Sequence, residues 1–402
     1  MPKVDQRGFD NQREEFLDAR RAAAFLGVQA RTLYAYASRG LVARVRAGRR
    51  SRYARADLER LKARHDARAG HGPVAGGALH FGEPVLPTRI SAVGPEGPRY
   101  RGQSAVELAS RGAPFLEVCA LLWEGGLEAP PVPTVETASK SEDPVLRLID
   151  VAMAGLRRSS APFGLAPEVE RGRAHALLLA FAGAAGPRRA PVTTVDPATR
   201  LLESFGLPPT PARRRLADAA LVLCADHELN ASTFAARVAA STGADLQACL
   251  IAALATFLGP RHGSASRALE AVLDEVGRPG RAQAVVRERT ARGEGMPGFG
   301  HPLYPKGDPR AGTLLALAAE TAAPRLRLLE AVIAATARVR GERPNLDAAL
   351  VATSLALGLP RGAAVALFAV GRTAGWVAHV LEQRESPAVL RPRARYLGPP
   401  GT

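Results

Sequence analysis

The chain has 402 residues, which is long enough for two or three domains and at least one large hydrophobic core. Its 54 Lys and Arg against 38 Asp and Glu give a formal net charge of +16. Residues 1–70 hold 17 basic and 8 acidic residues, so they carry 17 − 8 = +9, and the rest of the chain carries 16 − 9 = +7. This concentration of basic charge indicates a polyanionic partner for the N-terminal segment, although a solvated Arg-rich surface has the same composition.

Three cysteines, Cys119, Cys224 and Cys249, lie far apart in apolar, helix-patterned sequence. They fit neither a disulfide framework nor a metal-ligand spacing, so they indicate structural thiols in a reducing compartment. The N-terminus carries no apolar leader, and no uncharged run is long enough to span a membrane. These features predict a soluble, cytoplasmic protein with no metal and no membrane contact.

The basic N-terminal segment has the pattern of a small helical module. Residues 1–16 are polar and predict a disordered start, and Asp18 is placed to cap the helix that follows. The expected elements are a helix over 19–26, a second helix over 30–38, a two-stranded Arg-rich hairpin over 42–53 and a third helix over 56–67. A helix, a turn, a second helix and a basic hairpin within about fifty residues are typical of DNA-binding domains.

Residues 22–41 resemble the winged helix-turn-helix of the MerR/excisionase type, and residues 52–61 resemble the helix after its wing. We therefore expect a DNA-binding domain over 17–67, and the glycines that follow predict a flexible linker over 68–78. The resemblance implies that the second helix enters the major groove with Arg31, Thr32 and Tyr34, and that the wing contacts DNA with Arg49, Arg50 and Arg52. A docking or dimerisation module is the alternative interpretation.

From residue 79 onward the chain is expected to be mainly α. Short β-like pieces with Gly and Pro turns occupy 79–101, and a Pro/Ser/Thr-rich loop is expected over 126–144. Helical periodicity marks 104–123, 144–157, 169–185 and 211–223, and continues to residue 384 with loops at 257–265, 277–282, 292–311 and 341–346. Strands and helices do not alternate as a parallel sheet requires, so the body is predicted to be all-α.

Three polar stretches interrupt the helical pattern, and each contains one histidine. Residues 225–234 place His227 in a polar run that a packed core would not contain, because buried polar groups must be paired. A Gly-Pro turn delivers His262 just before a helix, where backbone N–H groups favour developing negative charge. His301 lies in a long Gly-rich loop, and such loops are usually functional. One such histidine is more often structural, but three in polar, Gly-flanked settings indicate a site.

Six ordered motifs resemble the citrate synthase family. They are His-Glu-Leu-Asn-Ala-Ser-Thr-Phe from 227, Gly-Pro-Arg-His-Gly from 259, Gly-Phe-Gly-His from 298 with Gly-Asp-Pro-Arg from 307, Pro-Asn-Leu-Asp from 344, Gly-Arg-Thr-Ala-Gly-Trp from 371 and Arg-Pro-Arg from 391. The Tyr-Arg-Gly sequence from 100 resembles an earlier motif of the same family. The resemblance implies a citrate synthase-like body with a large domain over 79–262 and 358–402 and a small domain over 263–357.

The resemblance also implies a reaction, the condensation of acetyl-CoA with oxaloacetate. Asp347 matches the base that removes a methyl proton next to the thioester. His262 matches the residue that stabilises the resulting enol or enolate, and His301 matches the residue that polarises the acceptor carbonyl. Hydrolysis of the condensed acyl-CoA then releases CoA, and neither a metal nor another cofactor is needed.

The remaining implied residues bind the substrates. His227, Arg310, Arg372 and Arg391 match the residues that bind oxaloacetate, and Gly298, Phe299 and Gly300 match a loop expected to bind CoA. Arginine suits a dicarboxylate because its planar guanidinium group binds a carboxylate bidentately and keeps its charge. In the family, the arginine matched by Arg391 reaches in from the partner subunit, so the resemblance implies a homodimer.

The chain departs from the family pattern at three places. Ser266 stands for a common Asn, Pro302 for an Arg common in bacterial members, and Ala-Ala-Leu over 348–350 for the usual Phe-Tyr-Ser. These departures leave the acyl-CoA open. Propionyl-CoA, which would give 2-methylcitrate, is an alternative substrate because one methylene is worth only about 1–3 kcal/mol of discrimination.

Other interpretations also fit parts of this pattern. Asp347 is placed to cap the helix after it, Arg372 and Arg391 to form surface ion pairs, and His379 to pack between helices. A different class of function is a DNA-binding regulator whose synthase-like body senses oxaloacetate, citrate or acyl-CoA. The two functions are compatible, because a dimeric synthase would present two helix-turn-helix units to a palindromic site.

Overall fold

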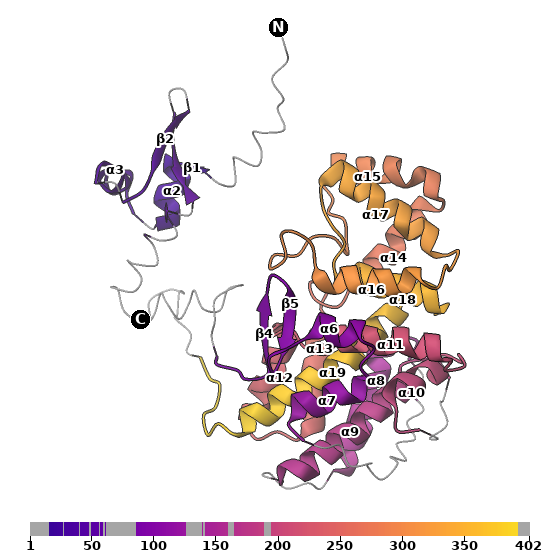
Figure 1. The fold of residues 1–402 in the computed structure, drawn as a ribbon. Coiled ribbons are helices and arrows are strands. Elements are labelled where there is room, and N and C mark those ends of the chain that lie inside the picture. Colours follow the sequence, from indigo (N-terminus) through magenta and orange to yellow (C-terminus); the bar gives the residue numbers. More distant parts are fainter. Residues whose placement is uncertain are drawn as a thin grey trace. The chain divides into compact units, whose positions relative to one another are not determined.

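The computed structural model describes residues 16–26, 28–39, 41–47, 50–55, 57–58, 61, 86–125, 139, 141–159, 165–188 and 194–392. The chain divides into two compact units, Met1–Pro87 and Thr88–Thr402 (Figure 1). Each unit has a hydrophobic core of its own.

The described part of the first unit combines a small sheet with helices. Its elements are β1 (Phe16–Asp18), α2 (Ala19–Leu26), α3 (Ala30–Ser38), β2 (Arg44–Ala47) and β3 (Arg50–Ala54). The helices predicted over 19–26 and 30–38 are confirmed. Ala22 of α2, Leu33 of α3 and Tyr53 of β3 are completely buried in one core, so each helix keeps a second face for solvent.

The sheet has three strands in the order β1-β3-β2, where the sequence predicted a two-stranded hairpin. Phe16 begins β1, so the predicted disordered start is wrong at its last residue. The cause is tertiary, because Leu17 lies opposite Tyr53 in the antiparallel register and packs against the same core. The third predicted helix is helical at its described residues Asp57, Leu58 and Leu61, and its other residues, residues 1–15 and the linker lie outside the described part of the chain.

The second unit begins with an antiparallel sheet of β4 (Ser91–Gly94), β5 (Gly97–Tyr100) and β6 (Gln103–Ser104). Its helices are α6 (Ala105–Ser110), α7 (Phe115–Trp123), α8 (Pro144–Arg158), α9 (Pro167–Ala184), α10 (Pro197–Ser204), α11 (Pro211–Cys224), α12 (Ala231–Ser241), α13 (Leu246–Phe257), α14 (Ala265–Val276), the 3-10 helix η1 (Pro279–Arg281), α15 (Ala282–Ala291), α16 (Pro309–Ala319), α17 (Leu326–Arg340), α18 (Leu346–Leu357) and α19 (Ala363–Arg384). The predicted mainly α body is confirmed.

One α-helix, α10, was not predicted, and the 3-10 helix η1 lies within the loop expected over 277–282. Helix α10 begins where Asp196 accepts a hydrogen bond from the Thr199 N–H at 3.1 Å, and Pro197 occupies its first turn. Both are ordinary helix-start signals. The helix is short and its apolar residues are few, so periodicity alone did not identify it.

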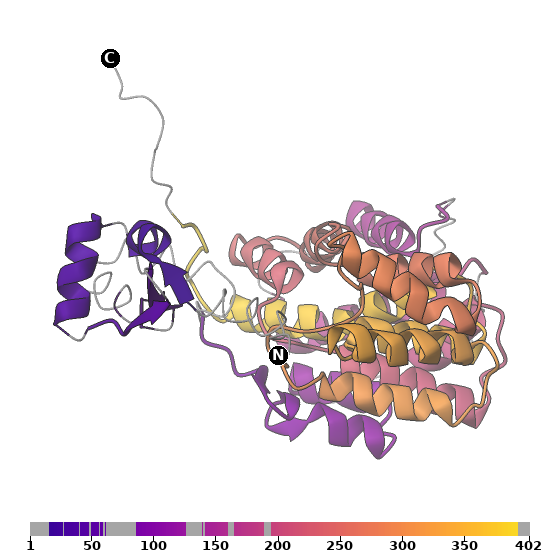
Figure 2. The same ribbon diagram turned by 90° about the horizontal axis from the view of Figure 1, so that it is seen from above.

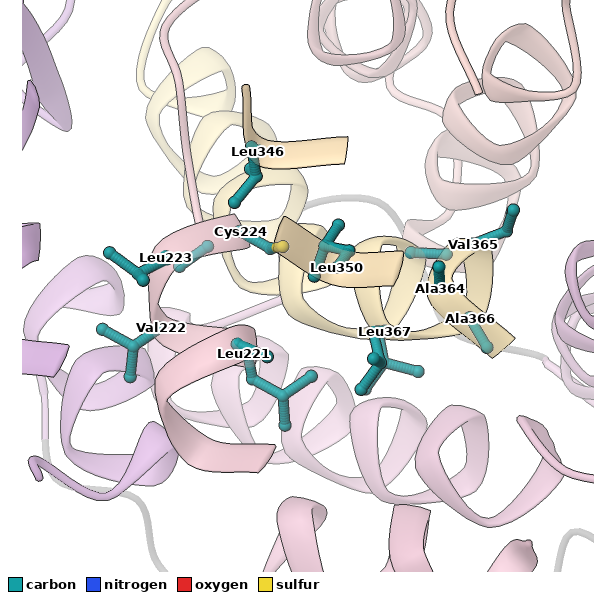
Figure 3. Close-up of a cluster of buried hydrophobic side chains, with 14 of the residues drawn as sticks. Leu221, Val222, Leu223, Cys224, Leu346, Leu350, Ala364, Val365, Ala366 and Leu367 are labelled. Carbon is teal, nitrogen blue, oxygen red and sulfur yellow. The ribbon is translucent and has the colours of Figure 1, made fainter. Parts of the chain in front are cut away.

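Helix α19 lies in the interior of the second unit (Figures 1 and 2). It contacts α7, α9, α11, α12 and α13, and nearly all of its residues are buried. Side chains from α11, α18 and α19 gather in one apolar cluster (Figure 3). By length and composition α19 is apolar enough to cross a membrane, but 89% of its apolar window is buried inside the body. Its hydrophobicity therefore belongs to the core.

Helices α14–α18 lie together at one end of the second unit (Figure 1). Within this group α16 contacts α18, and both helices also contact α11. The Leu346 N–H at the start of α18 donates to Asp308 at the start of α16, and Cys224 at the end of α11 lies in the electrostatic field of Asp308 and Asp347, so these three helix ends lie near one another. The division into a large domain and a small domain over 263–357 stays a prediction.

Candidate active site

His227 lies in the turn between α11 and α12, and the β4–β5 hairpin holds this turn. The Ser91 hydroxyl donates to the Asp226 carboxylate, and the Val93 N–H donates to Glu228 Oε1 at 2.9 Å. Glu228 has a φ of 55°, a left-handed conformation that is uncommon outside glycine. The hydrogen bonds of Asp226 and Glu228, on either side of His227, hold the turn in place despite the left-handed conformation of Glu228.

Asp226 accounts for part of the polarity of this turn. It is fully buried, and its Oδ2 lies 3.3 Å from Nε2 of the buried His379. Burial alone raises the pKa of a carboxyl group, but His379 and Arg372 outweigh it and hold the pKa of Asp226 below its usual value. Asn230 caps α12 with its side chain. These polar residues shape the turn that carries His227.

His262 closes a turn after α13. Its backbone N–H donates to the Gly259 carbonyl at 2.9 Å, and the Nε2 of its side chain lies 2.8 Å from Ser232 Oγ. Trp376 Nε1–H also donates to Ser232 Oγ, at 3.1 Å. Burial, and then Arg372, lower the pKa of His262 to about 4. The imidazole is therefore neutral at neutral pH and has one N–H to donate.

Ser232 was missed as a functional residue in the sequence, although it lies in the polar stretch of His227. Its hydroxyl is 2.8 Å from Asn230 Oδ1 and 2.8 Å from His262 Nε2, and it has one proton for these two acceptors. When that proton goes to His262, the imidazole carries its own proton on Nδ1 and can donate to a developing oxyanion. Only the fold brings these three side chains together.

The loop before α16 lies against the start of α18. Gly298 and Gly300 have φ values of 81° and 70°, and the Asn345 N–H and side-chain amide donate to their carbonyls, each at 2.9 Å. The positive φ of Gly298 favours glycine, and a Cβ there would also lie only 3.0 Å from Leu269 Cδ2 and 3.3 Å from the Ala348 Cβ. The N–H groups of Phe299 and Gly300 donate to backbone carbonyls of the protein.

His301 and Tyr304 of the same loop meet His227. The rings of His301 and His227 are 5.5 Å apart, and Tyr304 Oη lies 2.8 Å from His227 Nε2. Burial, and then Arg310, lower the pKa of both histidines, that of His227 to well below its usual value. Both imidazoles are therefore neutral at neutral pH.

Arg310 stands in the first turn of α16 and forms a two-point ion pair with Asp308. Its Nε lies 3.0 Å from Asp308 Oδ1, and its Nη2 lies 2.8 Å from Oδ2. Both side chains are buried. Asp308 Oδ2 also accepts a hydrogen bond from the Leu346 N–H at 3.2 Å. Asp308 therefore fixes the direction of the Arg310 fork and joins the starts of α16 and α18.

Arg372 lies on α19 and is 1% exposed, so the surface ion-pair interpretation is wrong for this residue. Its Nε donates to the Cys224 carbonyl at 2.6 Å, and its guanidinium carbon lies 4.6 Å from the centre of the Phe368 ring. Its buried Nη1 has no hydrogen-bond partner in the described part of the chain. Such a group is costly to bury unless a ligand supplies the acceptor.

Asp347 lies in the first turn of α18 and does not cap it. Asn345 is the cap, and its side chain accepts a hydrogen bond from the Asp347 N–H at 3.0 Å. Burial, opposed by Arg310 and Arg372, raises the pKa of Asp347 to about 6. This carboxyl group is a stronger base than an exposed one and is still ionised at neutral pH.

Arg310 and Arg372 act electrostatically on the same groups. Both lower the pKa of His227 and oppose the effect of burial on Asp347. Arg372 also acts on His262, and Arg310 on His301. The fold thus brings six of the seven predicted polar residues into one electrostatic neighbourhood: His227, His262, His301, Arg310, Asp347 and Arg372.

Arg391 is the residue that stands apart. It is exposed, and the Leu390 N–H before it donates to Ser241 Oγ at 3.0 Å, at the C-terminal end of α12. Ser232, the partner of His262, lies at the N-terminal end of the same helix. Nine helical residues span about 13 Å, so Arg391 does not join the cluster within its own subunit.

The predicted DNA-binding residues belong to two elements. Arg31, Thr32 and Tyr34 lie on α3, Arg50 and Arg52 lie on β3, and Arg49 lies outside the described residues. Arg31 is exposed and Tyr34 is 48% exposed, while Leu33 between them is buried. The outer face of α3 therefore presents basic and hydrogen-bonding groups to solvent.

Known proteins match both units. Residues 173–393 match the family "Citrate synthase, C-terminal domain", and residues 16–66 match the family "Helix-turn-helix domain". The chain is 37% identical over 328 residues to putative citrate synthase 2 of Mycobacterium tuberculosis H37Rv, covering 75% of this chain and 87% of that protein. It is 29% identical over 351 residues to citrate synthase of Mycolicibacterium smegmatis, covering 78% and 92%.

Solved structures of citrate synthases also match the chain. A ternary complex of Thermoplasma acidophilum citrate synthase with carboxymethyl coenzyme A and oxaloacetate matches with a TM-score of 0.69 and 25% identity, covering 79% of this chain and 95% of that one. Citrate synthase of Pyrobaculum aerophilum matches with a TM-score of 0.67 and 27% identity, covering 81% and 93%. Fold and site thus define an acyltransferase of the citrate synthase type. The chain belongs to the citrate synthase family, with a helix-turn-helix domain at its N-terminus.

Proposed function

We propose that the chain condenses acetyl-CoA with oxaloacetate to give citrate and CoA. The observation that carries this proposal is the pairing of a base with anion-binding groups. Asp347 is a carboxyl group with a pKa of about 6, in the field of the buried Arg310 and Arg372. A base for a carbon acid and two guanidinium groups for a dicarboxylate are what this reaction requires.

The first step is proton transfer from the methyl group of acetyl-CoA to Asp347. The negative charge that develops on the thioester oxygen is stabilised by the N–H of neutral His262, which Ser232 orients from 2.8 Å. A neutral imidazole is suitable, because it donates a hydrogen bond without requiring full protonation of the enolate.

The second step forms the new carbon–carbon bond. The enolate carbon attacks the keto carbon of oxaloacetate, and the C=O π electrons pass to the keto oxygen, which His301 polarises by donating a hydrogen bond. That oxygen takes up one proton to become the hydroxyl group of the product, which balances the proton removed from the methyl group. His227, Arg310 and Arg372 bind the acceptor, and the unpaired Nη1 of Arg372 offers a donor for a carboxylate. Water then cleaves the thioester of the condensed intermediate and releases CoA.

The site takes its last arginine from a second subunit in this proposal. Arg391 is exposed and lies toward the far end of α12 from Ser232, so it would serve the site of the partner in a homodimer. Residues Gly298, Phe299 and Gly300 would line the CoA side, next to Asp347 on α18. The absence of any metal or further cofactor, and a cytoplasmic location, stay predictions.

Identification of the product tests this proposal. Purified chain is incubated with oxaloacetate and either acetyl-CoA or propionyl-CoA, and products are measured by mass spectrometry. We expect citrate to form faster than 2-methylcitrate at equal acyl-CoA concentration. Faster formation of 2-methylcitrate would show that propionyl-CoA, not acetyl-CoA, is the preferred substrate. If no citrate and no 2-methylcitrate form at any concentration, the enzymatic proposal is overturned.

We also propose that the first unit binds double-stranded DNA. Exposed Arg31 and half-exposed Tyr34 on α3 support this, together with the +9 charge of residues 1–70. Helix α3 would enter the major groove, and the β2–β3 hairpin would contact phosphates with its arginines. A dimer would present two such units to a palindromic site.

Gel-shift titration with random double-stranded DNA at low salt tests this second proposal. We expect binding that weakens steeply as salt is raised, because exposed arginines displace counterions from phosphates. Lack of any shift at low salt would overturn it. A shift that oxaloacetate or acetyl-CoA modulates, in a chain that makes no citrate, would instead support a metabolite-sensing regulator.

A further inference from the structure

Phe257 ends α13 and supports the turn that carries His262. Its side chain is 2% exposed. The backbone N–H groups of His262 and Gly263 both donate to the Gly259 carbonyl, at 2.9 and 3.2 Å, so the chain folds back after α13. A Cβ on Gly263 would lie 2.2 Å from the Phe257 carbonyl oxygen and 2.9 Å from Cε2 of the Phe257 ring. The turn therefore rests directly on Phe257, and a side chain at residue 263 would push it away.

Aromatic rings from two helices meet at this place. The rings of Phe257 and Phe368 are stacked, with centres 4.8 Å apart and planes 6° apart. The Trp376 ring centre lies 6.4 Å from that of Phe257. We call Phe257, Phe368 and Trp376 the aromatic platform. Phe257 comes from α13 and the other two rings come from α19, so only the folded chain builds the platform.

The ring of His262 stands edge-on against this platform. Its centre lies 5.3 Å from the ring centre of Phe257 and 6.3 Å from that of Phe368, and its plane is 89° and 83° from theirs. Aromatic pairs favour this edge-to-face arrangement. The torsion that turns a histidine ring has broad minima, so neighbouring groups must fix the ring plane. Ser232 fixes the position of Nε2, and the platform fixes the plane.

The platform also contacts the acceptor arginine. The guanidinium carbon of Arg372 lies 4.6 Å from the Phe368 ring centre, and Trp376 Nε1–H donates to Ser232 Oγ at 3.1 Å. Arg372 is also the charged group that, together with burial, lowers the pKa of His262. The platform thus touches groups assigned to both substrates of the proposed reaction.

We propose that Phe257 is a positioning residue for His262: its ring sets the plane of the imidazole and keeps water away from it. An imidazole that turns out of this plane directs its N–H away from the thioester oxygen, where the enolate charge develops. Such a change raises the barrier of the first step and leaves the binding of the acceptor unchanged. This inference rests on the proposed function, because it uses the assignment of His262 to the enolate.

NMR titration of chain labelled with 13C-histidine, from pH 8 to pH 5, tests the proposal without turnover, and His262→Gln identifies the signal. In the wild type His262 should stay largely neutral, because burial and Arg372 lower its pKa to about 4. Phe257→Leu keeps an apolar side chain but removes the ring. Water then reaches the imidazole, so the pKa of His262 should rise into the titrated range. An unchanged titration in Phe257→Leu would overturn the proposal.

Phe181→Leu is the matched control, because it makes the same change at a completely buried ring of α9 in the same hydrophobic cluster. It should leave the titration of His262 unchanged. If Phe257→Leu does not fold, Phe257→Met takes its place, since methionine fills irregular space without an aromatic ring.

Steady-state kinetics of citrate formation test the consequence. The kcat of Phe257→Leu should fall about tenfold, because small misplacements of a catalytic group are costly. The KM for oxaloacetate should stay nearly constant, as expected when an interaction of the transition state alone is lost. An equal fall of kcat in Phe181→Leu, or a higher KM without a lower kcat, would mean that Phe257 only supports the fold, and would overturn the positioning role. If the wild type forms no citrate, the proposed function fails, and the titration still decides whether Phe257 shields His262.

Discussion

The two units of this chain use arginine in opposite settings. In the second unit Arg310 and Arg372 are 3% and 1% exposed, and hydrogen bonds orient both guanidinium groups. In the first unit Arg31 and Arg44 lie exposed on α3 and β2. A buried, oriented guanidinium group suits one small dicarboxylate, whereas an exposed one suits a long polyanion in solvent.

This difference shows what net charge can and cannot reveal. The excess of +9 in residues 1–70 identifies the segment with exposed basic groups. Such a count does not reveal Arg310, because the charge of Arg310 is cancelled by Asp308, two residues before it in the sequence. Burial, not charge excess, distinguishes a small-anion site from a polyanion surface.

The largest effect is expected in the buried site, from loss of the base. Asp347→Asn should lower kcat by about 10³-fold, since general base catalysis contributes about 10²–10⁴. The measurement is the initial rate of CoA release. Asp274→Asn, which removes an exposed carboxylate, is the matched control and should be unchanged. A rate for Asp347→Asn within a few-fold of the wild type would rule out its role as the base.

The next effect separates charge from geometry in the same site. Arg310→Lys keeps the charge but loses the planar guanidinium group that Asp308 orients. The KM for oxaloacetate should therefore rise by about 10²-fold. Steady-state kinetics measure this, with the exposed Arg361→Lys as control. If both lysine variants have the same KM, the buried fork contributes nothing to acceptor binding.

The pH dependence should separate the two units. With the pKa of Asp347 raised to about 6, the base is lost as pH falls, so kcat/KM should drop about tenfold per pH unit below 6. His262, with a pKa of about 4, stays neutral through most of this range. Arginine does not titrate there, so DNA binding measured in the same buffers should stay nearly constant. Rates that are flat down to pH 5 would contradict the assignment of Asp347.

The smallest effect is expected on the exposed surface. Arg31→Ala should weaken DNA binding a few-fold and reduce the slope of log K against log salt by about 1 if Arg31 contacts a phosphate. Arg325→Ala, an exposed arginine of the second unit, is the control. Neither change should alter KM for oxaloacetate. An unchanged salt slope in Arg31→Ala would remove this residue from the phosphate contacts.

Much of the fold could be predicted because local signals mark the elements. The helices over 19–26 and 30–38 agree with their predicted bounds, since turn residues delimit them. The strand Phe16–Asp18 could not be predicted, because it exists only through pairing with β3. Helix α10 had start signals in Asp196 and Pro197, but too few apolar residues for its period to be recognised.

The candidate site divides in the same way. His227, His262 and His301 were found because each stands in a polar stretch of an apolar sequence. Ser232 and Tyr304 lie in those stretches too, yet their contacts with His262 and His227 exist only in the fold. A sequence motif identifies the residues that are polar, whereas only the fold identifies the polar atoms that contact them.

The most direct test of the buried site as a synthase is the release of free thiol from acetyl-CoA by the full chain, with and without oxaloacetate. We expect release that requires oxaloacetate and that Asp347→Asn removes. No release at saturating concentrations of both substrates, from a chain that still binds DNA, would contradict the catalytic assignment and favour a regulatory body.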